Sequence, residues 1–148
     1  MKQRDRQERD AAASKVDVLN EALPWIHRSA GKTFVIKYGG SAMEDPELCR
    51  QVVADIELLK LMGIRIVVVH GGGKAINAQL KALGIPVAFK DGLRVTDDAT
   101  MAAVQQVLVG QVNQRLVWAL NEYGHNAVGI SGADGKTLKA APIDPELG

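Results

Sequence analysis

The sequence has one cysteine, few aromatic residues, no excess of charge of either sign and no long apolar run. A lone cysteine, Cys49, excludes an internal disulfide and is expected to be a small buried thiol on a helix. Eighteen basic and seventeen acidic residues leave a net charge of +1, which disfavours nucleic acid or an anionic membrane as a partner. No segment is long and apolar enough to span a bilayer. We therefore expect a cytoplasmic protein that binds any anion locally.

Several familiar site patterns are also missing. No Cys/His cluster has metal-ligand spacing and no Ser/His/Asp arrangement is apparent, so we expect no metal site held by protein side chains. Trp25 and Trp118 are expected to pack rather than to stack on bases, because no basic stripe surrounds them. The charged residues 1–10 contain no apolar stretch, and we expect no targeting peptide there.

Two short apolar strands run directly into glycines. Residues 67–69 precede Gly71–Gly73, and residues 34–36 precede Lys37 and then Gly39–Gly40. Glycines at a strand end let backbone N–H groups approach an anion, and a following helix adds the positive end of its dipole. One such segment is often only a tight turn. Two of them, one with a lysine, favour an anion site between the two loops.

The second glycine loop matches neither common phosphate-binding motif. Ile76 stands where a dinucleotide fingerprint that starts at Gly71 has its third glycine, and Ala75 follows Lys74 where a Walker A loop has Ser or Thr. Lys74 is either a ligand for an anion or, as we expect at a helix start, a solvated side chain. For His70 we expect a hydrogen-bonded structural role rather than that of a ligand or base.

Hydrophobic periodicity predicts a right-handed β-α-β unit over residues 33–69. Its strands are expected at 33–37 and 64–69, with a helix between them that Asp45 caps and that ends at Gly63. Further along we expect a helix from Gly73 to Gly84, a hairpin turning at Asp91-Gly92, a helix capped by Thr96 that ends near Asn121, and strands at 127–130 and 138–141. The fold class is therefore α/β with a mainly parallel sheet.

The chain begins with an amphipathic pattern. Val16, Leu19, Leu23 and Ile26 recur at spacings of three and four, which predicts a helix that Pro24 bends or restarts. This helix packs either on its own domain or, as an arm, on a neighbouring subunit. The pattern alone favours neither.

Two basic side chains are candidates for contact with an anionic ligand. Lys37 would be a point charge beside a transferring phosphoryl group, unless it is a solvated lysine at a strand end. Arg94 lies on a turn before a helix, where its guanidinium could grip a carboxylate with two hydrogen bonds, unless it forms a surface ion pair.

These residues together resemble the amino-acid kinase family. Residues 35–40, 69–73 and 92–96 stand in the order and contexts of that family's motifs. The resemblance implies a three-layer αβα fold with a mainly parallel central sheet. Residues 31–148 would be its N-terminal, substrate-binding lobe, preceded by the helix and charged tip of residues 1–30, while the family's second half is absent from this chain.

The resemblance also implies a reaction and its residues. A member of this kind transfers the γ-phosphoryl group of MgATP to the γ-carboxylate of N-acetyl-L-glutamate, with Mg²⁺ carried by the nucleotide. By resemblance, Lys37 is the catalytic lysine; the phosphate-binding residues are Lys37, Gly39 and Gly40; and the substrate-binding residues are Gly72, Gly73 and Arg94.

Residues 21–26 are similar to the helical extension of arginine-inhibited members of the family. That similarity implies a homo-oligomer, a dimer or a hexamer, with arginine feedback inhibition and a PII-type regulator as further partners. Trp25 stands where those relatives often carry a tyrosine. Two other functions remain open: a sister kinase acting on glutamate, aspartate or carbamate, and a non-catalytic binding or assembly module.

Overall fold

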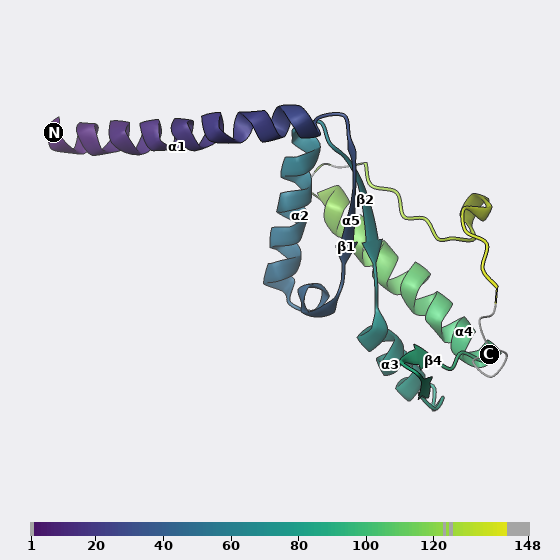
Figure 1. Ribbon diagram of the computed structural model, residues 1–148. Coiled ribbons are helices and arrows are strands. Elements are labelled where there is room, and N and C mark those ends of the chain that lie inside the picture. The colour runs from purple at the N-terminus through teal and green to yellow at the C-terminus, as the bar shows by residue number, and fades with distance from the viewer. Residues whose placement is uncertain (1, 123, 125, 142–148) are drawn as a thin grey trace.

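The fold is built on a parallel pair of strands. The computed structural model describes residues 2–122, 124 and 126–141. In it β1 (Thr33–Tyr38) pairs in parallel with β2 (Arg65–His70), and α2 (Pro46–Leu61) connects them (Figure 1). The ladder runs from Thr33 opposite Arg65 to Tyr38 opposite His70. The predicted β-α-β unit is confirmed.

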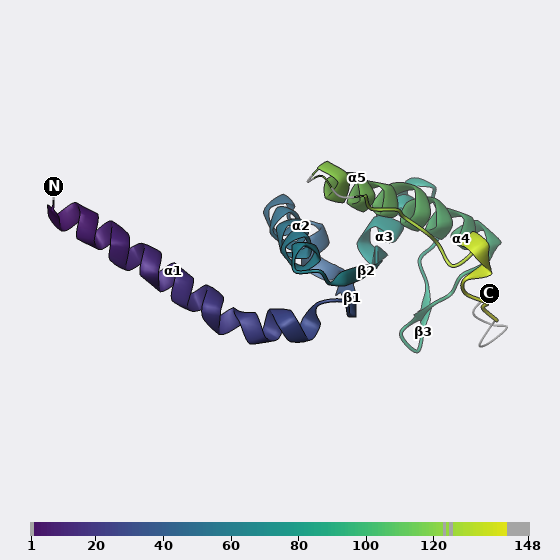
Figure 2. The same cartoon turned by 90° about the horizontal axis from the view of Figure 1, so that it is seen from above.

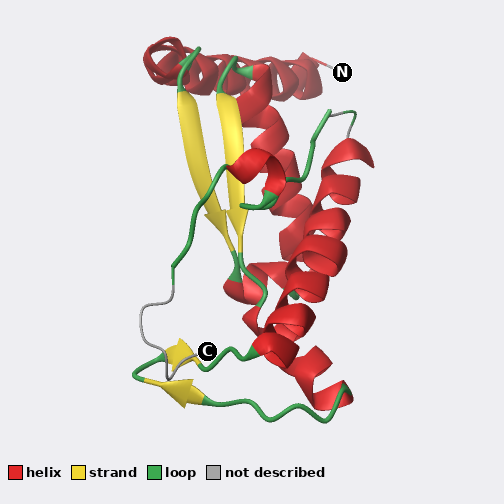
Figure 3. Ribbon diagram, turned by 90° about the vertical axis from the view of Figure 1, so that its right-hand side faces the viewer, coloured by secondary structure: helices red, strands yellow, loops and turns green. Residues whose placement is uncertain are grey.

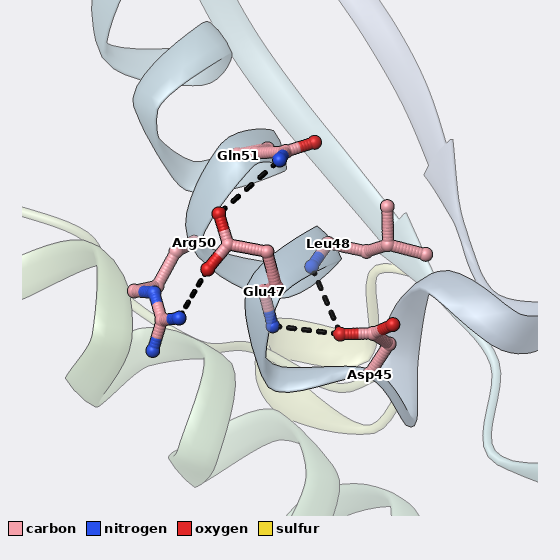
Figure 4. Close-up of polar contacts among 5 residues, drawn as sticks. All are labelled: Asp45, Glu47, Leu48, Arg50 and Gln51. Atoms are coloured by element: carbon pink, nitrogen blue, oxygen red, sulfur yellow. Dashed lines mark hydrogen bonds and ion pairs between the residues drawn. The ribbon is translucent and has the colours of Figure 1, made fainter.

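The start of α2 is fixed by local side-chain hydrogen bonds (Figure 4). The Asp45 carboxylate accepts from the backbone N–H of Glu47 at 2.8 Å and of Leu48 at 3.3 Å, which satisfies two amides that have no partner within the helix. Hydrogen bonds from Arg50 and then Gln51 lower the pKa of the Glu47 carboxyl. The predicted cap at Asp45 is confirmed.

Helices cover one face of the sheet. Figure 2 shows α2 and α5 (Gln114–Glu122) on the same side of β1 and β2. The buried side chains on that side are Tyr38, Val53, Ile56, Leu116 and Leu120. The other face carries Val35 and Val67, which are 68% and 48% exposed. Two of the three expected layers are therefore formed by the described residues.

A second buried cluster joins α3 (Gly73–Ala82) to a long helical stretch. That stretch comprises α4 (Asp98–Gln105), the π-helical segment η2 (Gln106–Asn113) and then α5. Its buried members are Ile76, Leu80, Ala103 and Val107. This cluster holds the helix that starts at the second glycine loop against η2.

The cap of α4 differs from the prediction. Asp97, not Thr96, is the N-cap, because its carboxylate accepts from the Thr100 backbone N–H at 2.8 Å. Hydrogen bonds from Thr100 lower the pKa of this carboxyl. The Thr96 hydroxyl instead donates to the carbonyl oxygen of Arg94 at 3.0 Å. Both residue types suit a cap, and backbone geometry selects the aspartate.

The hairpin is confirmed, but the two later strands are not. β3 (Phe89–Lys90) pairs antiparallel with β4 (Leu93–Arg94), with positive φ at Asp91 and Gly92 in the turn (Figure 3). Residues 127–130 and 138–141 are not assigned as strands. A strand needs a partner for its backbone groups, whereas Ala127 exchanges two hydrogen bonds with the Asn121 side chain. The short helices η1 (Gly40–Met43) and η3 (Asp134–Lys136) complete the described elements.

The N-terminal helix α1 (Lys2–Ser29) projects away from the rest of the chain (Figure 1). Val16, Leu19 and Trp25 are all more than half exposed, so the apolar stripe does not pack on its own domain. The helix continues through Pro24, whose carbonyl oxygen accepts from the Arg28 side chain at 3.2 Å. Of the two arrangements left open by the sequence, packing on the same domain is thereby excluded for the described side chains. None of the described helices is long and apolar enough to cross a membrane.

The second buried cluster gives a prediction for stability. Leu80 is fully buried, so Leu80→Ala should lower the free energy of unfolding by about 2–5 kcal/mol, because the cavity cannot collapse completely. Leu83, the C-cap residue of α3, is 53% exposed, and Leu83→Ala should cost less than about 1 kcal/mol. Urea denaturation followed by circular dichroism measures both. Equal losses would contradict the assignment of Leu80 to the core.

Candidate active site between two glycine loops

The parallel ladder brings the two glycine loops together. Because β1 and β2 run in the same direction, both chains leave the sheet at the same edge. The N–H of Gly71 donates to the Tyr38 carbonyl at 3.1 Å, directly linking the start of one loop to the start of the other. Gly40, in the first loop, has a φ of 68°, a conformation that favours glycine. The predicted meeting of the loops is confirmed.

A cavity of about 610 Å³ lies at this edge. Three of the glycines predicted for the site line it: Gly40, Gly72 and Gly73. The remaining lining residues are Tyr38, Met43, Glu44, Cys49, Lys74, Ala75, Val112, Arg115 and Leu116. The cavity therefore combines glycine backbone from two loops with side chains of both charges.

Lys74 is a largely solvated side chain, as expected, and it also forms an ion pair. Its ammonium lies 2.7 Å from the Glu44 carboxylate, so an ion pair connects the second glycine loop to the segment after the first. Both side chains are well exposed, at 77% and 45%, and an exposed pair of this kind contributes little to stability. Its clearer effect is positional, since it joins the two sides of the cavity.

Tyr38 and Cys49 form the inner part of the lining. The Tyr38 hydroxyl donates to the Ala42 carbonyl at 2.8 Å, and burial, followed by a hydrogen bond with Cys49, raises the pKa of this phenol. Tyr38 is thus a neutral structural donor that supports the turn of η1. Cys49 is only half-buried, which differs from the buried thiol expected, and its packing against the core is otherwise as expected.

Lys37 and Arg94 lie outside the cavity lining. Neighbouring strand residues point to opposite faces, so Lys37 shares the open face of the sheet with Val35, while Tyr38 faces the helices. Lys37 is exposed, and its side chain has no hydrogen bond or ion pair within the described part of the chain. Arg94 is half-buried on β4 and donates to the Asn77 side chain at 2.6 Å. The roles assigned to both residues stay predictions.

His70 has the structural role expected of it. Its Nδ1 atom lies 3.0 Å from the Gly71 carbonyl oxygen, and its side chain is half-buried at the end of β2. This contact holds the ring beside the backbone of the second loop.

Three polar residues of the region were not singled out from the sequence: Glu44, Asn77 and Arg115. Asn77 follows Gly73 by one helical turn, a spacing that places both on the same side of α3, so a signal for it was available. Arg115 reaches the cavity from α5, far along the chain, and no local pattern indicates that approach.

The packing of the second glycine loop against η2 leaves no room for a side chain at Gly72. A Cβ atom at this position would lie 2.7 Å from Cδ2 of Leu108 and 3.3 Å from Cγ2 of Val112, both on η2. At Gly73 a Cβ atom would meet nothing within 4 Å. A side chain at position 72 would therefore clash with η2, whereas a side chain at position 73 would not.

A parallel β-α-β unit with glycine loops meeting at the carboxyl edge of its strands, where a cavity lies, defines an α/β protein. The sequence comparison is more specific. The chain belongs to the amino acid kinase family, whose model matches residues 32–145.

Comparison with individual proteins shows which members of the family the chain is similar to. The chain is 54% identical over 129 residues to the chloroplastic acetylglutamate kinase of Arabidopsis thaliana, covering 87% of this chain and 37% of that protein. It is 52% identical over 138 residues to an acetylglutamate kinase of Trichormus variabilis, covering 93% of this chain and 46% of that protein. The chain therefore spans less than half the length of these curated relatives.

A solved structure has a similar fold. The fold is similar to that of N-acetylglutamate synthase from Neisseria gonorrhoeae complexed with coenzyme A and N-acetyl-glutamate, with a TM-score of 0.60 and 33% identity. That match covers 72% of this chain and 24% of the other. The expected α/β fold with a parallel sheet is confirmed by the structure, in agreement with the family match.

The contrast between the two glycines gives a second prediction. Gly72→Ala should lower the free energy of unfolding by about 1–3 kcal/mol, because the new methyl group forces Leu108 or the backbone to move. Gly73→Ala should leave stability nearly unchanged or slightly raised, since the position is helical and open. Thermal unfolding of both variants tests this, and an equal loss in both would show that the loop does not pack on η2.

Proposed function

We propose that this chain is the substrate-binding half of an acetylglutamate kinase, which transfers the γ-phosphoryl group of MgATP to the γ-carboxylate of N-acetyl-L-glutamate. One observation carries the proposal: the cavity between the two glycine loops, in a chain more than half identical to enzymes of that name. In this proposal residues 31–148 form the acetylglutamate-binding lobe, and the family's remaining half supplies most of the nucleotide site.

The proposed roles are those that the family resemblance implies, and the positions of Gly40, Gly72 and Gly73 at the cavity support part of them. Gly72 and Gly73 present backbone to N-acetyl-L-glutamate at the cavity. Arg94, on the neighbouring hairpin outside the cavity lining, binds its α-carboxylate. Gly39 and Gly40 approach the phosphoryl group of MgATP, and Lys37 stabilises the negative charge in the transition state. The glycines of both loops fit a phosphoryl group because they let backbone N–H donors come close to its oxygens.

In this reaction the protein mainly has to position the two substrates and supply positive charge. The acceptor is a carboxylate, which is already ionised at neutral pH, so its attack on a phosphorus atom requires no side-chain base. What remains is to hold two anions close together and to offset their repulsion. Lys37 has no partner within the described residues that would compete with a phosphoryl group for its charge.

The exposed helix α1 supports a wider proposal about assembly. Its apolar stripe is unpacked, as in an arm that contacts another subunit, so we propose a homo-oligomer, a dimer or a hexamer built through residues 1–30. Feedback inhibition by arginine and contact with a PII-type regulator belong to the same proposal. A cytoplasmic location does as well, with Cys49 as the single, unpaired cysteine.

A second candidate function is a non-catalytic binding or assembly module. It is favoured by the exposed apolar residues of α1 and the open face of the sheet. Substrate binding without turnover is common to both candidates, and it is therefore measured first.

Binding is tested by calorimetric titration of this chain after circular dichroism has confirmed that it is folded. N-acetyl-L-glutamate should bind with a dissociation constant near millimolar, about −4 kcal/mol, and unacetylated glutamate more weakly. Arg94→Ala should abolish binding, since it removes the donors for the carboxylate, while Arg28→Ala on α1 is the matched control. A folded chain that binds nothing would contradict the proposal that this half holds the substrate by itself.

Catalysis is tested in the complete enzyme that contains this chain. Lys37→Ala should lower turnover by about two to three orders of magnitude, because a donor to the transition state is lost. Lys32→Ala removes an exposed lysine just before the same strand and should have little effect. Near-normal turnover of the Lys37 variant would remove this residue from the mechanism.

A further inference from the structure

The guanidinium of Arg94 is held by two neighbours. Its Nη2 atom donates to Oδ1 of Asn77 on α3 at 2.6 Å, and its Cζ atom lies 4.8 Å from the centre of the Phe89 ring. Phe89 is the residue directly opposite Arg94 in the β3–β4 ladder. One contact thus comes from across the hairpin and the other from the helix that starts at the second glycine loop.

The other terminal nitrogen has no such neighbour. Nη1 of Arg94 is buried, and it has no hydrogen-bond partner among the described residues. A buried donor without an acceptor is costly, and native structures rarely keep one without a purpose. An acceptor that suits a guanidinium is a carboxylate, which can take one hydrogen from Nη1 and one from Nη2.

We propose that Asn77 and Phe89 are positioning residues that orient the Arg94 guanidinium for a ligand carboxylate. This rests on the proposed function, in which Arg94 binds the α-carboxylate of the substrate. Asn77 takes one hydrogen of Nη2 and fixes rotation in the guanidinium plane, while the Phe89 ring fixes the tilt of that plane. The second Nη2 hydrogen and Nη1 remain as a fork for one carboxylate.

The hairpin makes this arrangement adjustable. Nη1 is covered in this conformation, and Phe89 and Arg94, as a cross-strand pair, would move together if the short hairpin shifts to admit a carboxylate. Phe89 is 55% exposed, so its ring is not locked into a core. Asn77 lies on α3, and the buried residues Ile76 and Leu80 hold this helix in place. The Asn77 side chain is therefore the fixed partner of the Arg94 guanidinium.

The test uses the folded, ¹⁵N-labelled chain and two NMR measurements. The first is the Nε–Hε signal of Arg94 without ligand, assigned by its loss in Arg94→Lys. Asn77→Ala and Phe89→Leu should move this signal toward that of a solvated arginine, Phe89→Tyr should leave it in place, and Lys81→Ala on α3 is the control for helix stability.

The second measurement is titration with N-acetyl-L-glutamate. Asn77→Ala should weaken binding about tenfold and Phe89→Leu about threefold. The same substitutions should have no further effect in an Arg94→Lys background, because they act through the guanidinium. Equal weakening in both backgrounds, or an unchanged Nε–Hε signal, overturns the proposal.

Failure of the proposed function has a different signature. If the folded wild-type chain does not bind N-acetyl-L-glutamate, acetate replaces it as a simple carboxylate probe. An acetate-dependent shift of the Arg94 signal that Asn77→Ala weakens supports the positioning role and leaves only the substrate in question. A signal that no carboxylate moves overturns the positioning role as well.

Discussion

The parallel pairing of β1 with β2 is the constraint on which the rest of the structure depends. Its register places Tyr38 beside His70, so both strands end at one edge and their glycines meet there. The same alternation turns Tyr38 toward the helices and Lys37 toward the open face of the sheet. Without this register there would be no cavity between the loops, and α3 would not start beside η1.

Features set by neighbouring residues could be predicted from the sequence. The cap at Asp45, the turn at Asp91-Gly92 and the two glycine loops each depend on residues a few positions apart, and all three are present. The strands expected at 127–130 and 138–141 depend on a pairing partner, and a sequence pattern shows only which residues suit a strand. Thr96 and Asp97 are both good caps, so only the path of the backbone separates them.

The candidate site was predictable in part, for the same reason. Glycines at strand ends can be recognised from the few residues around them. Arg115 and Glu44 cannot, because Arg115 reaches the cavity from α5 and Glu44 lies there through an ion pair with Lys74. Periodicity indicates which face of an element is apolar, but not which other element that face meets. Lys37 illustrates the limit, since its place at a strand end was visible and its separation from the cavity lining was not.

The register of the sheet also affects the order in which parts of this chain fold. Thr33 pairs with Arg65 and every later pair keeps the same separation, so no rung of the ladder is a local contact. The segment between the two strands must close into a loop before the first pair of residues can form. Closing a loop costs conformational entropy, and contacts between neighbouring residues do not have this cost. Helix α2 has its own cap and its own i, i+4 hydrogen bonds, so it shortens that loop as soon as it forms. The Asp45 cap therefore influences the rate at which the sheet assembles, as well as the place where a helix starts.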